Sequence, residues 1–458
     1  MKRRWVGLAL MTEWLRVALG DLVSIKHGYA FKGEYFRNHP PGDILLTPGN
    51  FAIGGGFQLS KLKYYDGPPA AGFVLSPGDL LVTMTDLSKA GDTLGFPAIV
   101  PADGRRYLHN QRLGKVEIKS PRVSREFVYW LMRTATYRHE VLSGVTGSTV
   151  KHTSPSKICA FKFDLPPLEE QKSICDALNA LDDKVELNRQ MNVTLEAMAQ
   201  AIFRDWFVDF GPVRRKRAGA TDPVEIMGNL TPDPARAAEL AALFPEVLGD
   251  DGLPEGWSNP SLSDHLEIIG GGTPKTSIAE YWDGTIPWFS VVDTPSGSDL
   301  FVFSTAKSVT AAGVAGSSAR LIPEGTTIIS ARGTVGNLAI AAQEMTFNQS
   351  CYALQSTRGE HPCYVYLLAG HAVSQLRSMA HGSVFSTITR QTFDAMTFPS
   401  PPIKILDQLE AVLSPIFARI KAAGAENRTL AGTRDYLLPR LMSGAVRVGA
   451  KTRDDAKQ

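Results

Sequence analysis

The 458-residue chain has only four cysteines, and none of them forms a CxxC pair or a zinc-ligand spacing. We therefore expect Cys159, Cys175, Cys351 and Cys363 to be buried thiols, as in a protein of the reducing cytoplasm. No run of about 18 apolar residues occurs, so the sequence predicts no membrane-spanning helix. The formal net charge is only +2, so binding to nucleic acid requires basic residues concentrated on one face.

Motifs of catalysis are missing as well. The chain has no GxxxxGK[ST] phosphate loop, no HExxH and no GxSxG sequence. It also lacks the Asn-Pro-Pro-aromatic tetrapeptide of amino-methylating enzymes, and the glycine-rich run at 270–273 lacks the GxGxxG spacing. The histidines show no metal-ligand spacing. The sequence therefore predicts a chain with no catalytic, cofactor or metal site; an enzyme whose motifs have diverged is the alternative.

A long heptad pattern follows the two prolines at 166–167, which suit a helix start because the first N–H groups of a helix have no partner. Apolar residues recur there at alternating steps of four and three, which is typical of long helices that pack on each other. About 40 residues give a helix of about 60 Å. The seam consists of Ile174, Leu178, Leu181, Val185, Asn188, Asn192, Leu195, Ala199, Ile202 and Trp206.

A second heptad pattern repeats the first. It also opens with two prolines, Asn427 takes the place of Asn188, and Gln408 matches Gln171 after a two-residue insertion. Two unrelated amphipathic helices of one core are the alternative, but the repeated flanking motifs favour a duplication. The second seam consists of Leu409, Leu413, Ile416, Ile420, Ala423, Asn427, Leu430, Arg434, Leu437 and Leu441.

Each heptad pattern follows a globular block, and the two blocks repeat each other at a nearly constant offset. The Phe-Asn-Gln sequence at 347–349 matches His-Asn-Gln at 109–111, and the apolar run at 364–368 matches that at 127–131. A repeat of this length indicates duplicated domains. Short strands and tight turns within both blocks predict an α+β fold, in which two repeated domains are joined by two long antiparallel helices.

These patterns predict the organisation of the whole chain. Initiation at Met11 is an alternative to Met1. For the basic run RRKR at 214–217, a solvated surface and a phosphate contact both stay open. The expected segments are a flexible extension at 1–11, a first block at 12–165, a central long helix at 166–210, a mostly exposed linker at 211–255 with one short helix near 235–243, a second block at 256–400, a distal long helix at 401–445 and a flexible tail at 446–458.

Several motifs together resemble one family. They are FxxPPLxxQ at 163–171, IFRDWFVDF at 202–210, LPEGW at 253–257, GGTP at 271–274 and YLLPRLMSG at 436–444. Over residues 12–445 the chain resembles the specificity (S) subunits of type I restriction–modification systems. The resemblance implies two target recognition domains, each of which recognises half of a split DNA sequence, and a coiled-coil-like pair of helices that spaces them.

The resemblance also implies partners. Two adenine-methylating (M) subunits would dock on the long helices, and motor–nuclease (R) subunits would join to cut unmodified DNA. S-adenosylmethionine, ATP and Mg²⁺ would belong to those partners, so no cofactor is expected in this non-catalytic, cytoplasmic chain. A DNA-binding or scaffold module that works without the partner subunits is the alternative.

Candidate DNA-contacting residues come from loops in which glycines stand beside small hydroxyl and basic side chains, because such loops permit close approach of the backbone. Ordinary loop surface is the alternative for each of them. The candidates are Lys32, Ser148, Thr149, Lys151, His152, Lys275, Arg332, Thr334, Ser383, Ser386, Thr389 and Arg390.

Overall fold

The computed structural model of the chain describes residues 14–59, 62–88, 90–143, 150–379 and 387–448. The extension expected at 1–11 and the tail from 449 onward lie outside these residues. The chain divides into two compact units: Met1–Asp183 with Leu430–Gln458, and Lys184–Thr429. We call them the first and the second unit. No helix in the described ranges is long and apolar enough to cross a membrane.

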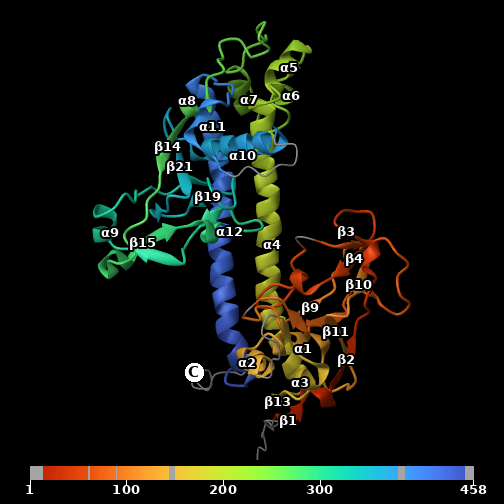
Figure 1. The fold of residues 1–458 in the computed structure, drawn as a ribbon. Helices are drawn as coiled ribbons and strands as arrows, with labels where there is room; N and C mark the ends of the chain where they lie inside the picture. The colour runs from red at the N-terminus through yellow and green to blue at the C-terminus, as the bar shows by residue number, and fades with distance from the viewer. Residues whose placement is uncertain (1–13, 60–61, 89, 144–149, 380–386, 449–458) are drawn as a thin grey trace, which may run out of the picture. The chain divides into compact units, whose positions relative to one another are not determined.

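The longest elements are two helices of 40 residues each, α4 (Leu168–Phe207) and α12 (Ile403–Met442) (Figure 1). Each begins directly after the predicted pair of prolines. Glu169 and Glu170 lie in the first turn of α4, where the helix dipole favours acidic side chains. Each helix contributes residues to both units, and we describe the two parts of each helix with the unit to which they belong.

Within each unit the two long helices pack on each other. In the first unit Ile174 and Leu178 of α4 share a core with Leu441 of α12. In the second unit Ile202 of α4 shares a core with Leu409 of α12. These buried positions belong to the seams that the heptad patterns predict, so the predicted pairing of two long helices is confirmed.

The block of the first unit contains a four-stranded antiparallel sheet of order β2-β11-β7-β9 and a five-stranded sheet of order β3-β5-β4-β10-β6. Side chains of α1 and α2 share a core with the four-stranded sheet. The remaining strands form the pairs β1–β13 and β12–β8. The strands are β1 (Leu15–Ala18), β2 (Val23–His27), β3 (Phe36–Arg37), β4 (Asp43–Leu46), β5 (Tyr64–Tyr65), β6 (Val74–Leu75), β7 (Leu80–Thr83), β8 (Thr85–Asp86), β9 (Pro97–Ile99), β10 (Tyr107–His109), β11 (Leu113–Ile118), β12 (Lys151–His152) and β13 (Lys162–Leu165). The helices are η1 (Leu19–Asp21), η2 (Gly33–Tyr35), η3 (Pro48–Asn50), α1 (Arg125–Leu131), α2 (Ala135–Ser143) and α3 (Pro155–Cys159).

The block of the second unit contains a five-stranded sheet of order β14-β21-β18-β19-β16 and a three-stranded sheet of order β17-β15-β20. Buried residues of α10 and of the five-stranded sheet belong to one core. The strands are β14 (Leu266–Gly270), β15 (Trp282–Phe289), β16 (Phe301–Val302), β17 (Lys307–Val309), β18 (Thr327–Ser330), β19 (Leu338–Ala341), β20 (Thr346–Phe347) and β21 (Cys351–Ser356). The helices of this block are α8 (Leu262–His265), η4 (Ala279–Tyr281), η5 (Val291–Asp293), α9 (Ala311–Ala315), α10 (Pro362–Met379) and α11 (Arg390–Asp394).

The internal repeat is visible in the sheet topology. The order β2-β11-β7-β9 of the first unit corresponds to β14-β21-β18-β19 of the second, and every neighbouring pair in both series is antiparallel. In both units the next helix after the second strand of the series, α1 or α10, shares a core with the sheet. The α+β fold with two repeated halves is therefore confirmed.

Two glycines occupy the same place in the two units because neither site leaves room for a side chain. A Cβ on Gly28 would lie 2.1 Å from the carbonyl oxygen of Asn110, and a Cβ on Gly271 would lie 2.2 Å from that of Asn348. Both asparagines accept a hydrogen bond from the backbone N–H two residues later. The Asn-Gln repeat in the sequence thus marks a close approach of two chain segments, which requires glycine.

The segment at 211–255 contains more helix than the mostly exposed linker with one short helix near 235–243 that we expected. It contains α5 (Gly211–Arg217), α6 (Pro223–Ile226) and α7 (Pro234–Ala241), not one helix. Val213 and Leu240 are buried in the same core as the end of α4. Proline-rich composition suggested a linker, but here the prolines begin helices, where their missing N–H has no cost.

We predict that Gly271→Ala lowers the free energy of unfolding by roughly 1–3 kcal/mol, because the new methyl group forces two backbone segments apart. Gly270→Ala is the matched control, since a Cβ at Gly270 meets nothing within 4 Å. Denaturant unfolding of both variants tests this. Equal stability of the two variants would contradict the close-approach argument.

Candidate nucleic-acid interface

In each unit, the segment that follows β7 or β18 pairs with a segment from late in the block. In the first unit β8 pairs with β12, so that His152 lies opposite Thr85. In the second unit Arg332 bridges to Thr387. The two pairs correspond: Arg332 takes the place of Thr85, and Thr387 takes the place of the candidate His152.

The backbone around these pairs is held by the same hydrogen bonds in both units. The N–H of Met84 donates to the oxygen of Arg112 at 3.0 Å, and that of Ala331 donates to Ser350 at 2.8 Å. On the other side, the N–H of Thr153 donates to the oxygen of Met84 at 3.0 Å, and the N–H of Ile388 donates to that of Ala331 at 2.9 Å. Equivalent bonds fix equivalent backbones, whereas the side chains differ.

In the first unit the pair combines a buried hydroxyl with an exposed imidazole. Thr85 is 6% exposed, and its Oγ1 lies 3.2 Å from Nδ1 of His152. The neighbouring Asp86 accepts hydrogen bonds from the N–H groups of Ser88 and Thr93 and from the Thr93 hydroxyl, at 2.5–2.7 Å. Burial raises the pKa of Asp86, but these bonds outweigh it and hold the pKa below its usual range. The carboxylate therefore stays charged and orders the loop.

In the second unit the corresponding loop is short and contains Arg332, Gly333 and Thr334, all exposed. Gly333 and Gly336 have φ angles of +82° and +81°, which favour glycine. The loop closes where the N–H of Gly336 donates to the oxygen of Ser330 at 2.8 Å. Among the described residues, none forms a hydrogen bond or ion pair with the Arg332 guanidinium, which leaves its donors available to a ligand.

Thr389 and Arg390 have local structural contacts. Thr389 precedes α11, and its N–H donates to the Thr392 hydroxyl at 3.1 Å. Nη2 of Arg390 donates to the oxygen of Ile268 on the edge strand β14 at 2.6 Å. In the first unit Ser154 precedes α3 in the same way.

Lys32 and Lys275 are exposed but are not joined to these pairs. Nζ of Lys32 lies 3.9 Å from a carboxylate oxygen of Glu34, and the oxygen of Lys275 accepts from the Trp282 indole at 3.2 Å. Within the described residues, no hydrogen bond, ion pair or strand pairing links either lysine to β8–β12 or to Arg332. The remaining candidates Ser148, Thr149, Ser383 and Ser386 lie outside the described residues.

Sequence reasoning missed Thr85 and Thr387. Thr85 directly follows a buried apolar strand, and nothing in its local sequence distinguishes it from that strand. The repeat could have located it, because Thr83-Met84-Thr85 aligns with Ser330-Ala331-Arg332 and one candidate was already identified there.

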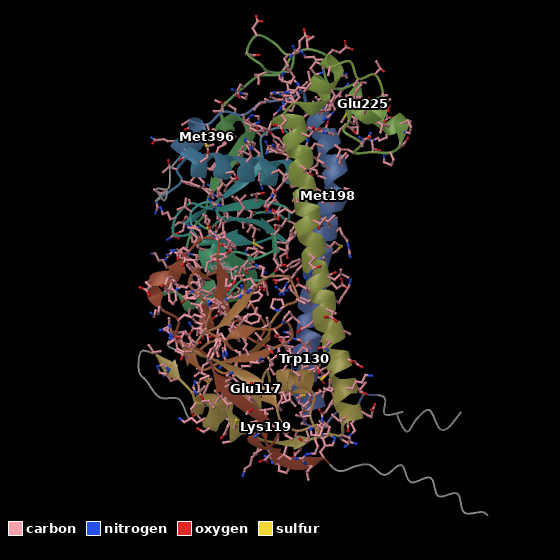
Figure 2. All side chains as sticks on the ribbon, turned by 90° about the vertical axis from the view of Figure 1, so that its right-hand side faces the viewer. Glu117, Lys119, Trp130, Met198, Glu225 and Met396 are labelled. Carbon is pink, nitrogen blue, oxygen red and sulfur yellow. The ribbon has the colours of Figure 1, made fainter. Side chains whose placement is uncertain are left out.

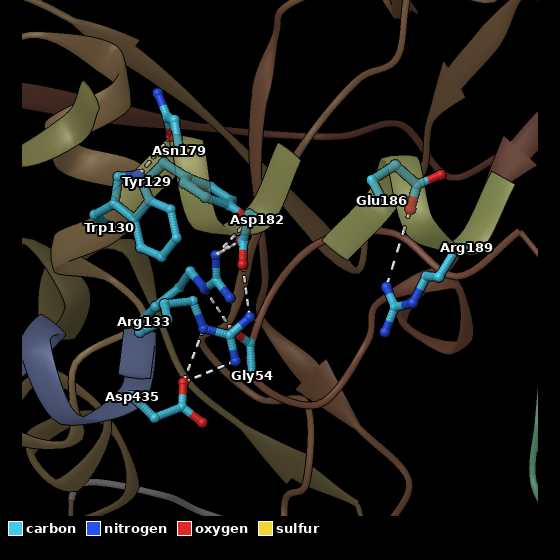
Figure 3. Close-up of polar contacts among 10 residues, drawn as sticks. Gly54, Tyr129, Trp130, Arg133, Asn179, Asp182, Glu186, Arg189 and Asp435 are labelled. Carbon is cyan, nitrogen blue, oxygen red and sulfur yellow. Dashed lines mark hydrogen bonds and ion pairs between the residues drawn. The ribbon is translucent and has the colours of Figure 1, made fainter. Parts of the chain in front are cut away.

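A charged cluster attaches the block of the first unit to both long helices (Figure 3). Asp182 of α4 accepts hydrogen bonds from Arg133, which follows α1, and from Arg434 of α12, both at 2.7 Å. Arg133 also donates to the oxygen of Gly54 at 2.7 Å, and its guanidinium carbon lies 4.2 Å from the ring centroid of Trp130. Burial raises the pKa of Asp182, but the two arginines bring it below its usual range. One carboxylate thus joins three segments of the unit.

The first turn of the helix after the sheet contacts a long helix in both units, but through different residues. In the first unit Gln171 of α4 accepts from the N–H of Ser124, which caps α1, at 2.9 Å. In the second unit Glu410 of α12 accepts from the N–H groups of Cys363 and Tyr364 in α10, at 3.1 and 3.3 Å.

The expected match between Gln408 and Gln171 is therefore wrong. Gln408 instead accepts a hydrogen bond from Arg236. Glu410 lies 239 residues after Gln171, which is also the separation of Asn188 from Asn427, to which Asn188 donates at 3.0 Å. Glu410, two residues later than Gln408, therefore takes the place of Gln171.

Part of the basic run at 214–217 is used within the second unit. Arg215 forms an ion pair with Asp205 at 2.8 Å, and Nζ of Lys216 donates to the oxygen of Phe244 at 2.7 Å. Only Arg214 and Arg217 are exposed. A phosphate contact therefore stays open for these two residues alone.

Two similar blocks present different side chains on corresponding backbones, an arrangement that suits the recognition of two different ligands. A family model described as "Type I restriction modification DNA specificity domain" matches residues 11–197 and 254–426, most of the chain. The chain belongs to this family. It is a specificity subunit of a type I restriction–modification system and recognises DNA targets. Such subunits are non-catalytic, and the cofactors belong to the M and R subunits.

Individual relatives agree with this assignment. The type I restriction enzyme HindI specificity subunit of Haemophilus influenzae is 27% identical over 477 residues, which cover 95% of this chain and 100% of the relative. The EcoBI specificity subunit of Escherichia coli is 27% identical over 197 residues, 43% of this chain and 38% of its own. A crystal structure of an S subunit from M. genitalium covers 95% of this chain and 97% of its own, with a TM-score of 0.52 and 12% identity, and shares the fold.

We predict that Asp182→Asn lowers the free energy of unfolding of the first unit by about 2 kcal/mol or more, because Arg133, with a side chain 6% exposed, loses its ionic partner. Since the folded-state pKa of Asp182 is depressed, its contribution is complete above the ordinary carboxyl pKa near 4 and is lost as the pH falls below it.

The adjacent Asp183→Asn is the matched control, because Asp183 is exposed and none of the described residues bonds its carboxylate. Thermal unfolding as a function of pH tests the prediction. If both variants lose stability equally, or if the difference between wild type and Asp182→Asn persists at low pH, the charged cluster does not hold the unit together.

Proposed function

We propose that this chain recognises a bipartite DNA sequence, with one half assigned to each block, and that it docks two M subunits together with R subunits. The observation that carries the proposal is the correspondence between the Thr85–His152 pair and the Arg332–Thr387 pair. Corresponding backbone positions that carry different side chains suit a protein that must recognise two different short sequences. Action on chromosomal DNA also implies a cytoplasmic location.

The candidate residues divide into two roles under this proposal. Exposed lysines suit contacts with phosphate, which position the protein without sequence information. His152, Arg332 and Thr334 suit contacts with base edges. Lys32 and Lys275 are the exposed lysines. The other candidates for DNA contact are Lys151, which is half-buried opposite Asp86, and Ser148, Thr149, Ser383, Ser386, Thr389 and Arg390.

An exposed, uncharged face on α4 in the second unit supports docking of a partner helix. Leu187 and Met198 are 59% and 50% exposed, and Met191 lies between them at helical spacing. Met198 is labelled in Figure 2. Between 190 and 203 the only charged side chain is Glu196, which accepts a hydrogen bond from Tyr366 at 2.9 Å. Exposed apolar patches of this kind mark interaction surfaces.

The other long helix of this chain, α12, has an exposed face of small residues in the same unit. Small side chains permit close approach of a further helix, because interaxial distance depends on the side chains at the contact. The exposed small residues are Ala411, Ser414, Ala418, Ala422 and Ala425.

Exchange of residues 12–165 for the first block of another family member tests the assignment of one half-sequence to each block. We expect the methylated sequence to change in one half only, as measured by methylome sequencing of cells that carry the complete system. A change in both halves, with the complex intact, would contradict independent blocks. Absence of any methylation that depends on this gene would favour a module that works without partner subunits.

Substitution on the exposed face tests docking. We expect Leu187→Lys combined with Met198→Lys to reduce co-purification of M subunits at least tenfold, because two charges enter an apolar contact. Ala238→Lys on an exposed position of α7 in the same unit is the control and leaves co-purification unchanged. If the double variant retains its M subunits, they dock elsewhere.

A further inference from the structure

We infer that the cross-strand pair in each block is the base-contacting pair: Thr85 with His152 in the first unit, and Arg332 with Thr387 in the second. The inference rests on the proposed function and assigns specificity to four named side chains. Within each pair, one residue contacts a base edge and the other completes or orients that contact. His152 and Arg332 are the direct contacts.

The first argument is that the backbone under each pair is fixed. Met84 and Ala331 each form hydrogen bonds on both sides, to the segment after β10 or β20 and to the late segment of the block. Such a backbone is already ordered, so binding to a base costs side-chain entropy but little backbone entropy at these positions. Most other exposed candidates lie on loops or helix starts without this two-sided support.

The second argument is the chemistry at Arg332. Its side chain is exposed, and none of the described residues forms a hydrogen bond or ion pair with the guanidinium. Arg390 and Arg358 of the same block instead donate to backbone oxygens. A planar fork of N–H donors matches the O6 and N7 acceptors of guanine in the major groove. The adjacent η5 adds Val292, which is 83% exposed and can contact a thymine methyl group. A Cβ at Gly333 would lie 3.8 Å from Cγ1 of Val291 in this helix.

The third argument concerns the first unit, where the same place has a different donor set. The Thr85 hydroxyl holds Nδ1 of His152, so the ring is oriented and Nε2 is left for a ligand. Asp86, buried beside Thr85 and charged, would repel a phosphate at this place but not an uncharged base edge. The pair therefore suits one hydrogen bond to a base, and Thr85 is a positioning residue.

Binding-site selection with the complete complex of S and M subunits tests Arg332. We expect Arg332→Ala to reduce the preference for one base pair of one half-sequence by roughly 10- to 100-fold, with the other half unchanged. Arg332→Lys keeps the charge but loses the fork, so we expect nearly the same loss of preference with little change in the salt dependence of binding. Arg320→Ala, at another exposed arginine of the block, leaves base preference unchanged.

The first unit has its own variants. We expect His152→Ala and Thr85→Val each to weaken the preference for one base pair of the other half-sequence. Thr85→Ser is expected to keep that preference, because serine retains the hydroxyl. A purely structural role for Thr85 would lower affinity for all sequences together and leave base preference as it was.

The outcomes separate this inference from the proposed function. If the wild-type complex selects a bipartite site and Arg332→Ala keeps every base preference, Arg332 contacts phosphate or nothing, and the base-contacting pair is overturned. If Arg332→Ala alters both half-sequences, the inference also fails. If the wild-type complex selects no bipartite site, the proposed function itself fails. Arg332 is exposed, so these variants are expected to fold, which thermal unfolding checks.

Discussion

The apolar seam between α4 and α12 is the constraint on which the rest of the structure depends. Most helical stability in proteins comes from burial of one face, and a 40-residue helix needs that face covered along its length. In each unit the other long helix provides the cover. The blocks then use side chains of these helices as partners: Gln171 contacts the cap of α1, and Glu410 contacts the first turn of α10. Loss of the seam would therefore remove the supports of both blocks.

Duplication has preserved backbone geometry more strictly than side-chain chemistry. The glycines at 28 and 271 are identical because a methyl group would overlap a carbonyl oxygen. In contrast, an amide at 171 and a carboxylate at 410 both satisfy backbone N–H groups, so either is tolerated. Attachment to the long helices also differs: Asp182 joins two arginines in the first unit, and Glu196 accepts from Tyr366 in the second.

The sequence predicted the long helices, the duplication and the α+β class, because these depend on periodicity and repetition along many residues. It did not predict how 211–255 folds, because prolines that begin helices look locally like prolines in a linker. Gln408 was mismatched because the repeated prolines suggested a shorter offset, and a difference of two residues turns a helix by more than half a turn. The match of Asn427 with Asn188, an offset of 239 residues, already places Glu410 against Gln171. Thr85 was missed because its importance comes from a strand partner far along the chain. Arg390 was identified, but its bond to Ile268 depends on tertiary structure.

The hydrogen bond between Asn188 and Asn427 joins two uncharged side chains that are 1% and 9% exposed. Dissolved ions screen interactions between charges, and affinity for DNA phosphates falls steeply as salt concentration rises. An amide pair inside a helix interface carries no charge to screen. Asn188 also donates to the carboxylate of Glu426, which forms an ion pair with Lys184, so only part of this contact responds to salt. The amide pair and the apolar seam keep the two helices of the second unit aligned at salt concentrations at which contacts with DNA phosphates weaken.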